Sequence, residues 1–174
     1  QTCALPISTE KDAIAVLNPI ANQYGVMRST LWGGLLANLK SNLNHGASRA
    51  RLFETGRVFK RDSSIQEAAG EVAGFSQAQK LGGIAYGSFV PEQWASATRV
   101  VDFFDVKGDL ERVLDPLDIV TESAEHPALH PGRSAKVFLK TLKNRIEVGW
   151  VGELHPRLQQ AYELPQAQIG RAHV

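Results

Sequence analysis

Residues 27–62, with the sequence MRSTLWGGLLANLKSNLNHGASRARLFETGRVFKRD, decide the fold of this chain. The first half predicts a helix that Ser29 or Thr30 caps and that continues to about Asn44. Four leucines on one helical stripe support this prediction: Leu35, Leu36, Leu39 and Leu43. The second half predicts a strand over residues 51–59. The stretch is therefore a helix that leads directly into a strand.

The rest of the chain alternates short strands with a few helices. The expected strands are residues 13–20, 80–86 and 119–123, with a hairpin over 135–150. The expected helices cover residues 106–114 and 156–164, and the expected loops are 63–79 and 126–132. This pattern predicts an α+β fold with a largely antiparallel sheet flanked by helices.

Two short tails are expected to be foreign to the natural protein. The codons that can encode residues 2–7, TCALPI, also encode residues 169–174, IGRAHV, when the opposite strand is read in a shifted frame. Coincidence is the alternative, but a protein has no physical reason to carry both strands of one oligonucleotide. We therefore predict that residues 1–8 and 169–174 are adaptor-derived, and that residues 9–168 are one module of a longer reading frame.

Composition limits the classes of function. Lys and Arg number 19 against 18 Asp and Glu, and this balance does not favour an autonomous nucleic-acid binder. The single cysteine, Cys3, lies in the first tail, so we expect no disulfide, no thiolate metal site and a cytoplasmic location. No apolar run approaches the roughly 20 residues that span a bilayer. The length suits one domain with a sizeable core.

Six short sequence words resemble, in their order, the β subunit of bacterial phenylalanine–tRNA ligase over nearly all of residues 11–166. The words are NPI at 18–20, MRS at 27–29, FETGRVF at 53–59, VDFFDVKG at 101–108, HPGRSA at 130–135 and GELHP at 152–156. Each word alone is weak evidence, whereas six of them in order are specific.

The resemblance implies an internal core module with the fold of class II aminoacyl-tRNA synthetases. It implies an α2β2 enzyme that uses ATP and magnesium to attach phenylalanine to tRNA(Phe), with the adenylate formed by the α subunit. The implied partners are the α subunit, the remaining β-subunit domains and tRNA(Phe), without a membrane. The family's functional residues lie in other segments, so no catalytic, cofactor-binding or metal residue carries over, and no cofactor is expected in this fragment.

Lys60 occupies the position where catalysis of this class needs an arginine. A guanidinium is a rigid fork that can grip a phosphate at two points, whereas a lysine is a point charge on a flexible stem. Strand alternation would turn Arg61 to the opposite face. We therefore expect a non-catalytic scaffold that supports the α subunit; the alternatives are an autonomous class II ligase domain or a tRNA-binding module.

Two pairs of residues have both a functional and a structural interpretation. Glu54 and Arg57 could recognise the acceptor end of a tRNA, but we interpret them as structural charges of a strand. His126 and His130 are spaced like metal ligands on a helix. A proline follows each of them and favours extended backbone, so we expect His130 to form a local hydrogen bond in a tight loop.

Two larger sets are also better explained by structure than by a ligand. An acidic cluster at a helix start could bind a cation, but the helix dipole accounts for it: Asp102, Asp105, Asp109 and Glu111. Three tryptophans without interleaved basic residues are interpreted as core or interface anchors, not as a base-stacking platform: Trp32, Trp94 and Trp150.

Overall fold

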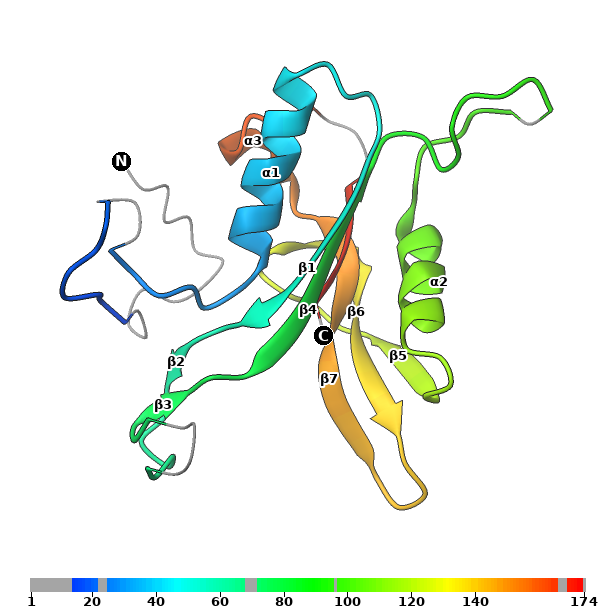
Figure 1. Cartoon of the computed structure of the whole chain (residues 1–174). Helices are drawn as coiled ribbons and strands as arrows, with labels where there is room; N and C mark the ends of the chain where they lie inside the picture. The colour runs from blue at the N-terminus through cyan, green and yellow to red at the C-terminus, as the bar shows by residue number, and fades with distance from the viewer. Residues whose placement is uncertain (1–13, 22–24, 68–71, 96, 166–168, 174) are drawn as a thin grey trace.

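The computed structural model of the protein describes residues 14–21, 25–67, 72–95, 97–165 and 169–173 (Figure 1). Its helices are α1 (Trp32–Asn44), α2 (Phe103–Val113) and α3 (Pro156–Ala161). Its strands are β1 (Ala50–Arg57), β2 (Lys60–Arg61), β3 (Phe75–Ser76), β4 (Gln79–Tyr86), β5 (Ile119–Ser123), β6 (Leu129–Lys140), β7 (Arg145–Leu154) and β8 (Ile169–His173).

The described strands form two antiparallel sheets. The large sheet has six strands in the order β1-β4-β8-β7-β6-β5, and the small one pairs β2 with β3. Figure 1 shows β2 and β3 as an extension beyond one end of β1 and β4. The α+β class and the antiparallel sheet are thus confirmed.

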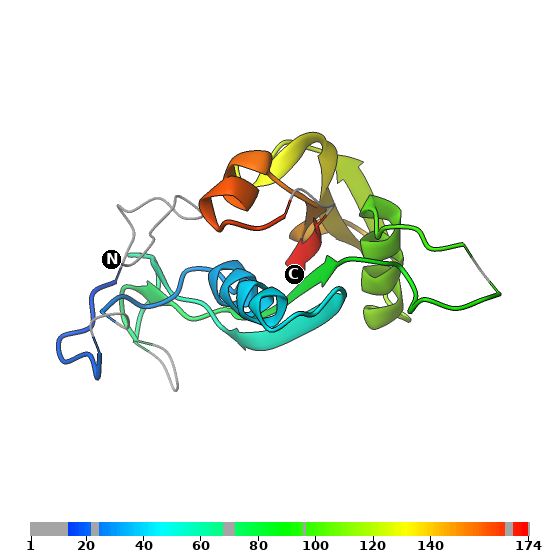
Figure 2. The same cartoon turned by 90° about the horizontal axis from the view of Figure 1, so that it is seen from above.

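The large sheet separates two hydrophobic cores, because alternate residues of a strand point to opposite faces. Ile84 of β4 joins the core beneath α1, whereas its neighbour Ala85 joins the core beneath α2. Helix α1 packs on β1 and β4, and α2 packs on β7 and β8. Figure 2 shows the two helices well separated when the molecule is seen from above.

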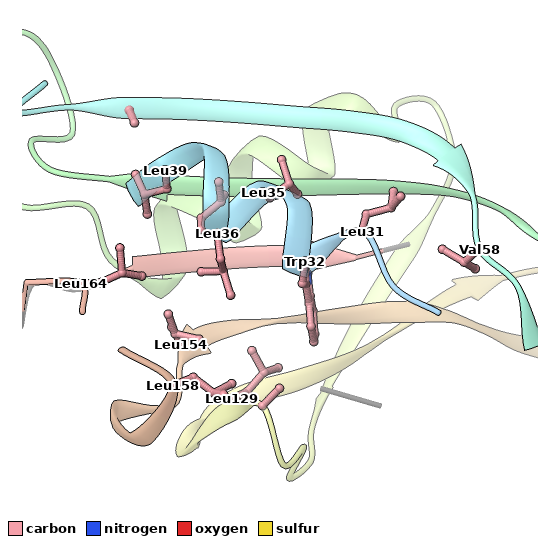
Figure 3. Close-up of a cluster of buried hydrophobic side chains, with 13 residues drawn as sticks. Leu31, Trp32, Leu35, Leu36, Leu39, Val58, Leu129, Leu154, Leu158 and Leu164 are labelled. Carbon is pink, nitrogen blue, oxygen red and sulfur yellow. The ribbon is translucent and has the colours of Figure 1, made fainter. Parts of the chain in front are cut away.

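Helix α1 owes its position to the predicted leucine stripe. Leu35, Leu36 and Leu39 are buried, and Leu43 packs against the same core at partial burial. Figure 3 shows Leu35, Leu36 and Leu39 with Trp32 of the same helix, and with Leu129 and Leu154, which reach the cluster from β6 and β7. The helix begins at Trp32, slightly later than predicted, and the Thr30 hydroxyl accepts a hydrogen bond from the Trp32 amide at 3.3 Å.

Helix α2 is fixed at its start by a reciprocal cap. The Asp102 carboxylate accepts from the Asp105 amide at 3.1 Å, and the Asp105 carboxylate accepts from the Asp102 amide at 2.9 Å. This arrangement satisfies amides that the first turn leaves without helical partners. Val106 and Leu110 then face the sheet and are buried.

Several predicted boundaries were wrong. The expected loop over 126–132 overlaps β6, which begins at Leu129 and continues through Pro131 with a register shift between Leu129 and Ser134. Residues 14–21 form no strand and contribute only a bridge between Ala15 and Val26. The expected loop over 63–79 contains β3, and α3 stops at Ala161, short of residue 164. Local sequence signals missed these features because partners distant in the chain set them.

The two predicted tails fare differently. Residues 1–8 lie outside the described residues, whereas Ile169–His173 forms β8 between β4 and β7. The backbone of Ile169–His173 pairs with strands on both sides, and the division of the chain at residues 8 and 168 stays a prediction. The adaptor origin of both tails stays a prediction as well. Among the helices that the structure describes, none has the length and apolar character needed to cross a membrane.

Candidate functional site

Lys60 stands at the position where a catalytic member of this class would carry a phosphate-binding arginine, and it lies outside the large sheet. Lys60 and Arg61 are exposed and form β2, where they pair with Ser76 and Phe75 of β3. The Arg61 guanidinium carbon lies 5.9 Å from the centre of the Phe75 ring. Neither cation points into one of the two cavities described below.

Glu54 is held by Arg28, a residue to which the sequence analysis gave no role. The Arg28 guanidinium pairs with the Glu54 carboxylate and donates from Nε to the Arg57 carbonyl at 2.9 Å. The Phe59 amide donates to the Arg28 carbonyl at 2.8 Å. These contacts support the structural interpretation of Glu54.

Gly56 makes room for this guanidinium. A Cβ atom at this position would lie 2.0 Å from Arg28 Nη2, far closer than any real contact. The side chain of Arg57 reaches Gln77 instead, with Nη1 donating to Oε1 at 3.5 Å. The strand thus uses Gly56 to accept an arginine across its face.

A second charged pair joins two of the family words. Arg133, from HPGRSA, lies 2.5 Å from the Glu153 carboxylate, from GELHP. The Glu153 side chain is only 7% exposed, so its charge needs this partner. His130 Nδ1 lies 2.5 Å from the Pro131 carbonyl oxygen, which confirms the expected local hydrogen bond.

His126 belongs to an aromatic cluster. Its ring lies 5.3 Å from that of Trp32, edge to face, and 4.9 Å from that of Trp150. Its Nδ1 accepts from the Ala128 amide at 3.1 Å. Within the described parts of the chain, no group of three His, Cys, Asp or Glu residues could hold a metal ion.

The three tryptophans do not form one platform. Trp32 is buried and donates from Nε1 to the Ala172 carbonyl at 3.4 Å, and Trp150 packs against the same core. Trp94 is fully exposed, away from that core. The core interpretation holds for Trp32 and Trp150, and an interface role for Trp94 stays a prediction.

The four acidic residues at the start of α2 take part in a helix cap and in ion pairs. Arg99 grips Asp105 with two hydrogen bonds of 2.6 Å, Lys107 lies 3.1 Å from Glu111, and Arg51 lies 3.7 Å from Asp109. These contacts, with the cap at Asp102, account for all four acids. The helix start was predictable from local sequence, whereas the partners Arg99 and Arg51 were not, because Arg51 comes from a distant strand and Arg99 precedes the helix.

The pKa values of Asp105 and Asp62 lie below the ordinary value of an aspartate. Hydrogen bonds from Arg99 are the main reason that the pKa of Asp105 lies below its ordinary value; burial opposes the shift. The hydroxyl and the amide of Ser64 lower the pKa of Asp62, which follows β2. In both cases the hydrogen bonds favour the charged form.

Two cavities among the described residues are large enough to consider as sites. The first, of about 340 Å³, is almost wholly apolar and lies between β1, β4 and α2. The second, of about 380 Å³, is more polar, and Asp102, Arg133 and Glu153 are among the residues that line it. Among the described residues that line these two cavities, no nucleophile is paired with a base.

Comparisons with known proteins agree on one family. The model of the phenylalanyl tRNA synthetase beta chain CLM domain matches residues 4–170. The phenylalanine–tRNA ligase beta subunit of Ralstonia nicotianae is 57% identical over 156 residues, which are 90% of this chain. The beta subunits of Burkholderia pseudomallei and Dechloromonas aromatica are 53% and 48% identical over 90% and 92% of the chain. The chain spans 19% of the length of each relative.

Proposed function

This chain belongs to the family of the phenylalanyl tRNA synthetase beta chain CLM domain, and from that membership we propose a non-catalytic role for it. It is a synthetase-like scaffold module of a phenylalanine–tRNA ligase β subunit. The module supports the catalytic α subunit in the ATP-dependent attachment of phenylalanine to tRNA(Phe). The whole enzyme is a cytoplasmic α2β2 heterotetramer that uses ATP and magnesium.

One observation carries the proposal: charged residues of the family words form ion pairs and caps within the module. Arg28 pairs with Glu54, Arg133 pairs with Glu153, and Asp105 caps α2 while Arg99 grips it. Side chains engaged in this way hold strands and helix ends together. They are therefore not free to grip a nucleotide or an amino acid.

The position of Lys60 supports the same proposal. A class II site needs a planar guanidinium on the sheet that carries the substrate, and Lys60 is an exposed ammonium on the small sheet. Arg61 lies beside the Phe75 ring. The antiparallel sheet with α1 packed on β1 and β4 supports the synthetase-like fold.

Substitution of Lys60 in the assembled α2β2 enzyme distinguishes the scaffold hypothesis from the hypothesis of a ligase domain. We expect Lys60→Ala and the matched control Arg61→Ala to leave the rate of tRNA charging within about twofold of the wild type, because neither cation meets substrate. Calorimetry should detect no ATP binding to this module. A loss of charging on the order of a hundredfold in Lys60→Ala alone would favour the ligase domain.

Deletion of the module tests the supporting role directly. A β subunit that lacks only residues 9–168 should fail to form a stable complex with α, and α should then lose tRNA charging. The readouts are co-purification of the two subunits and the rate of aminoacylation. Normal assembly and normal charging would show that the scaffold role is wrong.

A further inference from the structure

The face of β1 and β4 opposite α1 is hollow and apolar. Phe53 of β1 is 80% exposed there, and Gly83 of β4 leaves the floor without a side chain. Val106, Leu110 and Val113 of α2 form the other wall of the cavity of about 340 Å³. We call this cavity, between the outer face of β1 and β4 and the side of α2, the apolar groove.

We propose that the apolar groove is the docking site for the aliphatic face of an amphipathic helix from another part of the β subunit. The inference rests on family membership and does not depend on the non-catalytic role proposed above.

The dimensions of the open face fit one helix. Helix α2 packs on β7 and β8 and leaves β1 and β4 uncovered on this side. Two strands spaced about 4.8 Å apart present a strip roughly 10 Å wide, which is about the diameter of a helix. A helix laid on this strip would lie beside α2 at the 8–10 Å spacing of packed helices.

The two charged residues of the groove are compatible with an apolar occupant. Arg51 and Asp109 lie on facing walls, 3.7 Å apart, and offset each other. Arg51 Nη1 is buried and has no hydrogen-bond partner within the described residues, and its burial lowers the pKa of Arg51. A charged ligand would compete with this pair. An aliphatic helix face leaves the pair in place, and its apolar contacts must exceed the cost of burying the pair further.

The β subunit itself is the favoured source of the helix. The relatives are about five times longer than the segment they share with this chain, since that segment is 19% of their length. A helix on the same polypeptide has an effective concentration on the order of millimolar, whereas a partner subunit must first be encountered. An uncovered apolar groove would also make the free β subunit prone to aggregate.

Thiol labelling of the full-length β subunit, purified without α, tests the proposal. Phe53→Cys and Val113→Cys would be introduced separately, one on each wall of the groove, with the other cysteines replaced. Leu142→Cys, on the fully exposed turn after β6, is the control. We expect both groove thiols to react with a maleimide at least about tenfold more slowly than the control, since tenfold corresponds to about 1.4 kcal/mol of protection.

If a side chain of the module itself fills the groove, the helix should no longer dock, and the groove thiols should lose their protection from labelling. A Cβ atom on Gly83 meets only the Leu52 carbonyl oxygen, at 3.7 Å, so Gly83→Leu fits the module but occupies the floor of the groove. We expect Gly83→Leu to restore fast labelling at Val113→Cys. Gly108→Leu, which meets nothing within 4 Å, should leave the protection unchanged.

Three results would overturn the proposal. Groove thiols that label as fast as Leu142→Cys in β alone would show an open groove. Protection that appears only when α is added would assign the groove to α, and protection that rises with β concentration would assign it to a second copy. Circular dichroism of each variant confirms that it is folded, so slow labelling reports coverage of the groove. These labelling results are independent of the rate of tRNA charging by the Lys60→Ala variant, so the docking proposal can fail while the proposed non-catalytic role stands.

Discussion

Arg28 shows what a single side chain contributes to this module. It leaves the segment before α1, crosses β1, pairs with Glu54 and donates to the Arg57 carbonyl. Since Arg28 is partly exposed, each contact alone contributes little stability. Together they fix the approach of the chain to α1, and they do so only because Gly56 carries no side chain.

A double-mutant cycle between Arg28 and Gly56 measures this contribution. Gly56→Ala forces the Arg28 guanidinium away from Glu54, so it should lower the free energy of unfolding. In an Arg28→Ala background the same change should be neutral or stabilising, because alanine suits a strand better than glycine. We expect a coupling energy of about 1 kcal/mol in urea unfolding. Additive effects would contradict the contact.

Asp105 makes the free energy of unfolding depend on pH in the acidic range. Its folded-state pKa lies below the unfolded value of about 3.9, so its contribution is complete above that pH and is lost as pH falls through the folded pKa. Asp105→Asn should therefore destabilise the chain at pH 7, and the difference from wild type should shrink below about pH 4. Urea unfolding at both pH values checks this.

The control for Asp105 is Asp118→Asn. Asp118 pairs with Lys140 at 3.4 Å in an exposed setting and caps no helix. Its replacement should change stability by less than about 0.5 kcal/mol at pH 7. An Asp105→Asn variant that matched this control at every pH would remove the proposed role of the Arg99 pair.

Among the elements, α1 depends most on packing. Its N-cap, Leu31, makes no capping hydrogen bond through its side chain, and two glycines stand in its first turn. Each glycine costs roughly 1 kcal/mol relative to alanine. The buried stripe of leucines therefore provides the stability that local signals do not.

Leu36→Ala tests this dependence. Leu36 is fully buried between α1 and the sheet, so truncation should cost about 2–5 kcal/mol of unfolding free energy. Leu142→Ala, on an exposed turn, should cost less than about 0.5 kcal/mol. Thermal and urea unfolding of both variants give the comparison. Equal losses would mean that α1 is not held by its leucines.

The whole molecule depends on β8. This strand lies between β4 and β7, and its Ala172 contributes to the core beneath α2 while accepting a hydrogen bond from Trp32 on the α1 side. The sheet is therefore continuous only when β8 is present. Both cores share this one strand.

Truncation after Gln168 should therefore abolish cooperative unfolding. Without β8, the β1–β4 pair and the β5–β6–β7 group have no strand between them, and the edges of β4 and β7 lose their backbone partners. Removal of Val174 alone is the control and should leave the transition unchanged. Urea unfolding followed by tryptophan fluorescence and circular dichroism should give coincident curves only for the control. A cooperative transition in the longer truncation would contradict this role of β8.

The amino-acid sequence determined what depends on near neighbours. The leucine stripe of α1, the strand Ile119–Ser123 and the helix start near Asp102 follow from periodicity and capping, which act over a few residues. The lysine in place of an arginine at position 60 was also visible from the sequence alone.

Tertiary structure alone decided what depends on distant partners. Arg28 meets Glu54 across 26 positions and Arg133 meets Glu153 across 20, and no local pattern encodes such a match. The place of β8 and the open face beside Phe53 are set by the strand order, which depends on long-range pairing. Local propensity therefore chose the elements, and burial and pairing between them chose the contacts.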